Sequence, residues 1–322
     1  LVEECKKKLG DLKNKTILDV GTNDGSLLDF FKKYKSTTIG IEPTGAAKDA
    51  NRKKHYIINE YFNERSVKIL QKKYNKIDII TFTNVFAHID DIQLLIKNLK
   101  KIINEDTLLV IENHYLGSVL KKKQFDTFYH EHPRTYSLKS FIHIAKLLDM
   151  NVVDYSFPKR YGGNIRVFLK RNHKNVQKKF SLIKDENNFK IYFSEIKKFI
   201  KFWKFRKLKI LKKSYKKYGL LDGKAFPGRA AILIKILGIN EKIINSVYEK
   251  PNSKKNGFYI PGTKIPIKSD RELLKKIKKL KIIINFAWHI DSEIKTYLKR
   301  NGFKGKVIDI LDKQDLLWKK KI

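Results

Sequence analysis

Proton-handling side chains are concentrated in one short stretch of this sequence, FDTFYHEHPRTYS. Tyr129, Glu131 and His132 lie there, around a further histidine at position 130. An imidazole titrates close to neutral pH, and both imidazole and phenol groups can hydrogen-bond a developing negative charge. Another histidine, His88, follows an apolar run in NVFAHIDD, and we expect it in a loop at the edge of a sheet where ligands bind. The residue types in these two stretches predict acid–base chemistry.

A glycine-containing turn between a predicted strand and a predicted helix forms a second candidate site. It lies in TILDVGTNDGSLLDFF, and its candidate ligand contacts are Asp19, Gly21, Asn23, Asp24 and Gly25. The glycines permit a tight turn and close approach of a ligand, and the helix N-terminus offers N–H donors. Because Asn23 and Asp24 occupy its middle, the turn differs from the GxGxxG pattern of dinucleotide sites.

An acidic residue, Glu42, closes the next predicted strand about 20 residues later, at the offset of a carboxylate that binds both hydroxyls of a ribose. Together, the turn and Glu42 resemble the S-adenosylmethionine (SAM) site of class I methyltransferases. An acidic rim suits this ligand, which carries a sulfonium and an ammonium. In INEYF, Asn59 is a candidate for reading the polar edge of adenine, and Phe62 for packing on its face. The alternatives are a generic Rossmann-like turn and a Phe62 that belongs only to the core.

The elements that must position these residues alternate between short apolar strands and amphipathic helices. Predicted strands cover residues 17–20, the stretch that ends at Glu42, and apolar runs in KIDIITFTNVF and TLLVIENHYL. This alternation is typical of an α/β fold whose mostly parallel sheet is covered on both faces. We expect a SAM-binding domain at 1–173, a basic helical linker at 174–220, and a smaller Rossmann-like domain at 221–322, which the family resemblance described below implies does not bind SAM.

Composition limits the class of partner. The 322 residues carry a formal net charge of +38, mostly from lysines spread along the whole chain. Phosphate clamps and base readout favour clustered Arg and aromatic residues, so we do not expect a nucleic-acid partner, although the charge would attract a smaller anion such as a nucleotide diphosphate. The single cysteine, Cys5, excludes an internal disulfide and a thiolate metal cluster, which suits the cytoplasm.

Membrane association has little support in the sequence. No apolar run reaches the ~20 residues of a membrane span. The basic amphipathic stretch FSEIKKFIKFWKFRKLKILKKSYKKYG admits two interpretations, a helix at a membrane surface and a helix between domains with a solvated lysine face. We favour the second interpretation and expect no membrane partner.

Several motifs occur together in one order and resemble the sugar C-methyltransferases that act on nucleotide-linked 4-keto-deoxysugars. These motifs are ILDVGTNDGSLL, IGIEPTGAA, NVFAHIDD, FDTFYHEHPRTYS and YGGNIRVFL, followed by GRAAILIKILGI, GFYIPGTKIPI and FAWHIDSEI. The resemblance implies a SAM-binding domain followed by a second Rossmann-like domain. It also implies methyl transfer to a carbon beside the C4 ketone, usually C3, through an enolate.

The same resemblance implies roles for the proton-handling residues. His132 would be the general base, and Tyr129 would hydrogen-bond the sugar or the enolate. Glu131 would orient or support the imidazolium, and His88 would polarise the ketone oxygen. The division of these roles among His88, Tyr129 and His132 stays open, and the reaction needs no metal.

The sequence departs from the family pattern at two places. Tyr161 and Asn164 stand where the family more often has His-Gly-Gly-Ser. Cys5 is the only cysteine, so we expect that the family's cysteine-rich, zinc-binding N-terminal domain was lost, is encoded separately or was removed from this chain. Arg166, in the same stretch, is a candidate for a sugar-diphosphate contact or for a structural ion pair. The rival functions are an O- or N-methyltransferase of another small molecule, an RNA methyltransferase, and a non-catalytic partner subunit. The sequence leaves the nucleotide, the sugar and the oligomeric state open.

Overall fold

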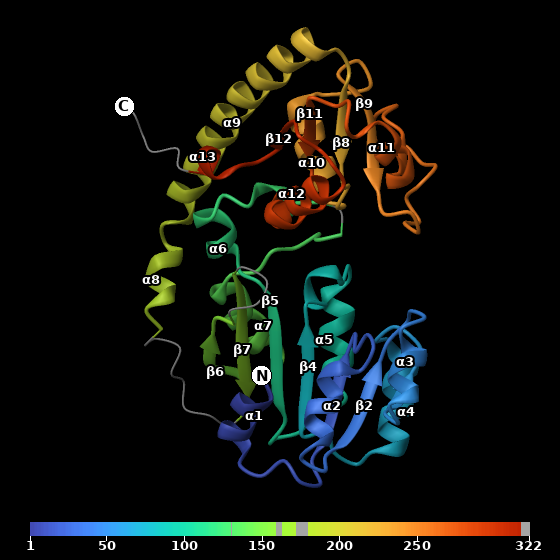
Figure 1. Ribbon diagram of the computed structural model, residues 1–322. Coiled ribbons are helices and arrows are strands. Elements are labelled where there is room, and N and C mark those ends of the chain that lie inside the picture. Colours follow the sequence, from blue (N-terminus) through green and yellow to red (C-terminus); the bar gives the residue numbers. More distant parts are fainter. Residues whose placement is uncertain (130, 159–162, 172–179, 317–322) are drawn as a thin grey trace. The chain divides into compact units, whose positions relative to one another are not determined.

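The computed structural model describes residues 1–129, 131–158, 163–171 and 180–316. Its contacts divide the chain into two compact units, whose elements Figure 1 labels. Unit 1 comprises Leu1–Lys121 and His130–Lys190, and unit 2 comprises Lys122–Tyr129 and Ile191–Ile322. The stretch that carries the proton-handling residues is therefore divided, because Tyr129 belongs to unit 2 and His132 to unit 1.

Unit 1 is built on a sheet with the strand order β3-β2-β1-β4-β5-β7-β6. Strands β1 to β5 are parallel, whereas β7 is antiparallel to both β5 and β6. The strands are β1 (Thr16–Val20), β2 (Thr37–Ile41), β3 (Tyr56–Ile58), β4 (Ile79–Thr83), β5 (Leu108–His114), β6 (Asn151–Ser156) and β7 (Asn164–Lys170). Because β1, β2, β4 and β5 run in the same direction, the loops that follow them meet at one edge of the sheet, the carboxyl edge.

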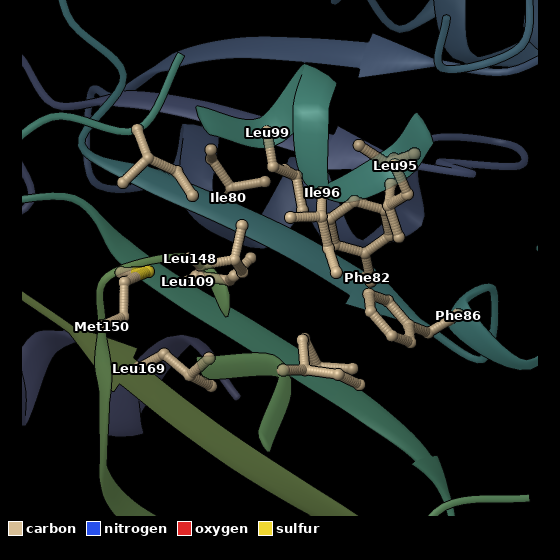
Figure 2. Packing of buried hydrophobic residues seen from close by; sticks show 14 of the residues in the cluster. Ile80, Phe82, Phe86, Leu95, Ile96, Leu99, Leu109, Leu148, Met150 and Leu169 are labelled. Atoms are coloured by element: carbon tan, nitrogen blue, oxygen red, sulfur yellow. The ribbon is translucent and has the colours of Figure 1, made fainter. Parts of the chain in front are cut away.

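Helices cover both faces of this sheet, as the sequence predicts. They are α1 (Val2–Leu9), α2 (Ser26–Lys32), α3 (Ala47–Arg52), α4 (Glu64–Lys73), α5 (Ile92–Lys100), α6 (Leu116–Lys121), α7 (Leu138–Leu147) and α8 (Leu182–Glu186). Successive strand residues point to opposite faces, so Ile17 packs with α1 and α2 whereas Leu18 packs with α4, α5 and α7. Figure 2 shows the second of these layers, where Leu95, Ile96 and Leu99 of α5 lie over β4 and β5. These two buried layers hold the carboxyl edge in place.

Helix α7 begins directly after the stretch that carries His132, and its first turn is firmly capped. The Ser137 hydroxyl accepts the Ser140 N–H at 3.0 Å and the Ser140 hydroxyl accepts the Ser137 N–H, which forms a capping box. The buried carboxylate of Glu186 accepts the N–H groups of Leu138 and Lys139 at 2.6 and 3.0 Å. These contacts fix the start of α7 and therefore the C-terminal end of the stretch that carries His132.

Unit 2 contains a second parallel sheet with the order β10-β9-β8-β11-β12. Its strands are β8 (Leu221–Lys224), β9 (Ile244–Glu249), β10 (Ile267–Ser269), β11 (Ile282–Asn285) and β12 (Lys306–Asp309), and its helices are α10 (Ala230–Leu237), α11 (Asp270–Lys276), α12 (Asp291–Arg300) and α13 (Lys313–Leu316). In sequence order this repeats the arrangement of β1 to β5. The second, smaller Rossmann-like sheet expected from the sequence is thereby confirmed.

The basic stretch before this sheet forms one long helix, α9 (Phe189–Tyr218), drawn in yellow in Figure 1. From residue 191 onward it belongs to unit 2, and its buried residues recur at helical spacing as Ile196, Phe199, Trp203, Lys207, Leu211 and Ser214. The Trp203 indole N–H donates to the Ile310 carbonyl at 2.9 Å. The apolar stripe of α9 is therefore used for packing within unit 2. No helix in the described ranges has the length and hydropathy needed to cross a membrane.

Candidate functional site

The turn after β1 adopts the conformation that its glycines permit. Gly21 and Gly25 have φ angles of 72° and 77°, in the left-handed region that side chains disfavour. A Cβ atom on Gly21 would lie 2.3 Å from a methyl of Val85, in the loop after β4, and one on Gly25 would lie 2.9 Å from the His55 ring. The backbone N–H of Gly21 donates to the Ile41 carbonyl of β2 at 2.7 Å. The turn therefore packs closely against Val85, His55 and the end of β2.

Asp19 lies beneath this turn and is 3% exposed. The Thr81 hydroxyl of β4 donates to its carboxylate at 2.6 Å. Burial raises the pKa of Asp19 to about 6, with a smaller contribution from the carboxylate of Glu42. A cation bound at the carboxyl edge would favour the ionised form of Asp19 and oppose this shift.

Glu42 follows β2 and is bound to the same turn. Its two carboxylate oxygens accept hydrogen bonds from the N–H groups of Asn23 and Thr44, each at 2.9 Å, and Glu42 is 6% exposed. The Asn59 amide donates to the Glu42 carbonyl at 2.6 Å. Glu42 therefore supports the turn itself, in addition to any contact with a ribose.

The remaining two predicted SAM contacts have local partners. The carboxylate of Asp24 is exposed and accepts the N–H and hydroxyl of Ser26 at 3.1 and 2.7 Å, contacts that hold the pKa of Asp24 below its usual range. Phe62 packs against the core and meets Phe82 edge to face, with ring centroids 6.0 Å apart. The core role of Phe62 is therefore observed, and its role as an adenine wall stays a prediction.

A cluster of three histidine rings, tilted by 51° and 53° to one another, lies in unit 1. The His132 ring centroid is 4.9 Å from that of His88 and 5.4 Å from that of His114. His88 ends the short 3-10 helix η1 (Phe86–His88) after β4, and His114 is the last residue of β5. The sequence predicted His88 and His132 as partners and missed His114, although its place at the end of a parallel strand was a usable signal.

The His88 ring makes a contact that determines its tautomer, that is, which ring nitrogen carries the proton when the ring is neutral. Its Nδ1 lies 2.5 Å from the Glu131 carbonyl oxygen. A carbonyl can only accept, so Nδ1 carries a proton, and in the neutral ring the lone pair is on Nε2. The Glu131 main chain thus orients His88, whereas the role predicted for the Glu131 side chain stays untested. Tyr129 is half-buried in unit 2, and the residues at positions 130 and 161 lie outside the described ranges.

A buried polar network lies at the ends of β5 and β7. The Arg166 guanidinium donates to the Glu112 carboxylate at 2.9 Å (Nε) and 2.6 Å, and it also pairs with Glu4. Of the two predicted roles of Arg166, the structural ion pair is the one observed. The fully buried Asn164 amide donates to the Asn84 side chain at 2.8 Å and to Glu112 at 3.2 Å.

A cavity of about 610 Å³ opens beside this network. Its lining includes Thr83 at the end of β4, Glu112 and Arg166, together with Ser26, Leu27 and Phe30 of α2. This volume falls within the range of small-molecule sites. In the described ranges, no group of three or more His, Cys, Asp or Glu side chains has the arrangement of a metal site.

The sheet order, the glycine turn after β1 and the acidic residue after β2 define unit 1 as a class I methyltransferase fold. Residues 2–155 match the family described as methyltransferase domain, and residues 159–308 match the family described as C-methyltransferase C-terminal domain. The chain thus carries a methyltransferase domain followed by a C-methyltransferase C-terminal domain.

Individual relatives are distant. C-methyltransferase NovU from Streptomyces niveus is 28% identical over 169 residues, which are 52% of this chain and 40% of NovU. A ubiquinone biosynthesis O-methyltransferase from Coxiella burnetii (strain RSA 493 / Nine Mile phase I) is 30% identical over 94 residues, 29% of this chain and 40% of that protein. The aligned part thus spans 40% of each of these curated relatives. Among solved structures, magnesium protoporphyrin IX methyltransferase (ChlM) from Synechocystis PCC 6803 with bound SAH has 14% identity and a TM-score of 0.43, over 53% of this chain and 80% of that chain.

The residues around the turn fit SAM. The left-handed glycines allow the tight turn whose backbone would approach the ligand, and the carboxylates of Asp24, Glu42 and Asp19 suit a cationic ligand. Burial is the main cause of the raised pKa of Asp19, and the nearby carboxylate of Glu42 adds a smaller contribution.

Proposed function

We propose that this chain methylates a carbon, with C3 the favoured position, beside the ketone of a nucleotide-linked 4-keto-6-deoxysugar. The match to a C-methyltransferase C-terminal domain and the similarity to NovU support carbon as the acceptor atom. The observation that carries the proposal is the cluster of His88, His132 and His114 in the methyltransferase unit. Removal of a proton beside a ketone requires a base and an oxyanion donor at short range, and an imidazole is suited to the role of base.

Gly21, Asn23, Asp24 and Glu42 would hold SAM, with Glu42 at the ribose and Asn59 and Phe62 at the adenine. When bound, SAM supplies an electrophilic methyl group whose transfer forms a C–C bond, breaks the S–CH3 bond and leaves S-adenosylhomocysteine. The residues of the chain orient the ligand and exclude water around it.

The chain's own contribution is to move the proton and to stabilise the enolate oxygen. His132 would take the proton from the carbon, with the Glu131 carboxylate supporting the imidazolium. His88 can donate from Nε2 only when its ring is protonated, because Nδ1–H already donates to the Glu131 carbonyl. A neutral phenol needs no such step, which favours Tyr129 as the oxyanion donor and leaves neutral His88 as an acceptor toward a sugar hydroxyl.

The test is an incubation in deuterated water with SAM and a panel of nucleotide 4-keto-6-deoxysugars, followed by mass spectrometry and NMR. We expect the mass of one added methyl group, located by NMR on a carbon beside the ketone. His132→Ala should abolish methylation and deuterium uptake at that carbon, while calorimetry shows nearly unchanged SAM affinity. The matched control is His143→Ala, which removes an exposed imidazole of α7 and should leave both signals intact.

The rival functions predict different outcomes. A methyl group on oxygen or nitrogen without deuterium uptake would establish the alternative small-molecule methyltransferase. Salt-sensitive RNA binding that tolerates His132→Ala would favour the RNA methyltransferase. Failure to bind SAM would favour a non-catalytic partner subunit. Loss of SAM affinity in His132→Ala would remove His132 from the role of base.

A further inference from the structure

The carboxyl edge of the unit 2 sheet has the geometry at which Rossmann-like folds bind ligands. In the order β10-β9-β8-β11-β12, the chain progresses in opposite directions from β8 and from β11, so a crevice is expected beyond the ends of these two strands. The loop after β8 ends at Arg229, directly before α10, and the loop after β11 leads into the 3-10 helix η5 (Trp288–Ile290).

This position is occupied by a carboxylate from a distant part of the chain. Asp126 lies on the 3-10 helix η2 (Phe125–Thr127), within the segment Lys122–Tyr129 that belongs to unit 2, and its side chain is fully buried. The Arg229 guanidinium grips both carboxylate oxygens, with Nε and a terminal nitrogen each at 2.8 Å. The Trp288 indole N–H adds a third hydrogen bond at 3.1 Å.

The rest of the segment is anchored in unit 2 as well. The Phe125 ring packs on Phe199 and Trp203 of α9, with centroids 6.0 and 5.1 Å away. The Lys123 ammonium donates to the Leu316 carbonyl at 3.3 Å. A bidentate, charge-assisted grip on a carboxylate matches the way such crevices hold the anionic groups of nucleotides.

We propose that the crevice of unit 2 binds the segment Lys122–Tyr129 in place of a diffusible nucleotide, and that Asp126 and Arg229 are positioning residues for Tyr129. Asp126 precedes Tyr129 by three positions, so releasing the carboxylate frees the backbone that aims the phenol. This inference rests on the proposed role of Tyr129 in methyl transfer. In this proposal unit 2 holds the segment that carries Tyr129 and does not need to bind a separate ligand.

We call the pairing of Arg229 with Asp126 the clamp. Hydrogen exchange in the whole chain tests the clamp without any substrate. In Asp126→Asn, we expect amides of peptides covering residues 122–129 to exchange about tenfold faster or more, because local opening no longer breaks a buried ion pair. The matched control is Asp270→Asn, which removes another buried carboxylate of unit 2, paired with Lys224 at 2.7 Å and outside the segment. This control should leave exchange at residues 122–129 unchanged.

Arg229→Lys provides a second test, because lysine keeps the charge and loses the forked grip. We expect faster exchange here too, of smaller size than in Asp126→Asn. Equal exchange at residues 122–129 in the wild type and in both clamp variants would overturn the clamp.

Positioning of Tyr129 is tested by kinetics. Asp126→Asn should lower kcat for methylation at least tenfold with SAM affinity unchanged, and in a Tyr129→Phe background it should cost almost nothing more, since the group it aims is absent. Independent, multiplicative losses would reject the positioning role. If the wild type methylates no 4-keto-deoxysugar, the proposed function fails, and the exchange measurement alone decides the clamp.

Discussion

Gly21→Ala should destabilise the turn after β1 in two ways, through its backbone conformation and through a steric contact. The left-handed φ of 72° penalises any side chain, and a new Cβ would also lie 2.3 Å from Val85 Cγ2. Gly10→Ala is the matched control, because Gly10 has a φ of 76° and open space where the Cβ would stand. The two variants therefore share a positive φ, which side chains disfavour, and differ in the close contact.

The magnitudes follow from this geometry. A left-handed alanine costs roughly 1–2 kcal/mol, part of which is offset by the reduced entropy of the unfolded chain. Overpacking against Val85 adds about 1–3 kcal/mol, so Gly21→Ala should be less stable than Gly10→Ala by about that amount. In Gly21→Ala/Val85→Ala the contact is relieved, and the combined cost should be smaller than the sum of the single costs.

The assay must report on unit 1. Within the part of the chain that the structure describes, the tryptophans are Trp203 and Trp288, and both belong to unit 2, so their fluorescence does not report on unit 1. Amide exchange in the β1 peptide gives the opening free energy of unit 1 directly. Calorimetry with SAM should show about tenfold weaker binding or more for Gly21→Ala and no change for Gly10→Ala. Equal opening free energies in the two variants would refute the close packing of the turn against Val85.

Three further predictions concern buried carboxylates of unit 1. Folding raises the pKa of Asp19 from 3.8 to about 6, so the stabilisation from its bound proton is complete below about pH 4 and is lost as the pH rises to about 6. Over that range, the free energy of unfolding of Asp19→Asn should rise by about 3 kcal/mol relative to the wild type, as measured by denaturant unfolding at several pH values. A difference that does not vary with pH would contradict the shift. Glu42→Ala should weaken binding of SAM more than binding of a 2′-deoxyribose analogue if the carboxylate contacts the ribose; equal losses would leave Glu42 only its observed task of holding Asn23 and Thr44. Glu186→Gln should destabilise the start of α7 by about 1–3 kcal/mol, because an amide NH2 would face a backbone N–H, and unchanged exchange at Leu138 and Lys139 would disprove this.

Local pattern predicted the parts of the site that lie close together in sequence. Gly21 and Gly25 need left-handed conformations that few other residues tolerate, and Glu42 comes directly after a short apolar strand. These features depend on backbone sterics and strand period, so the turn, its acid and the parallel sheet could be read without coordinates. The predicted contacts of these residues with SAM, and the roles of Tyr129, Glu131 and His132, stay predictions.

Contacts between distant segments required the structure. The sequence placed His88 and His132 in separate motifs and gave His114 no role, and it left Arg166 with two possible roles. It treated FDTFYHEHPRTYS as one catalytic piece, whereas Asp126 and Tyr129 belong to unit 2 and His132 to unit 1.

The sequence by itself therefore determined the class of fold, the alternation of strands and helices along the chain, and the residue types at the carboxyl edge. Tertiary structure decided which histidines cluster, that Arg166 pairs with Glu112, and that Arg229 hydrogen-bonds Asp126 across 103 positions of the chain. The physical reason is that strand period and turn sterics act over a few residues, whereas side-chain pairing depends on how two packed layers bring distant loops to one edge.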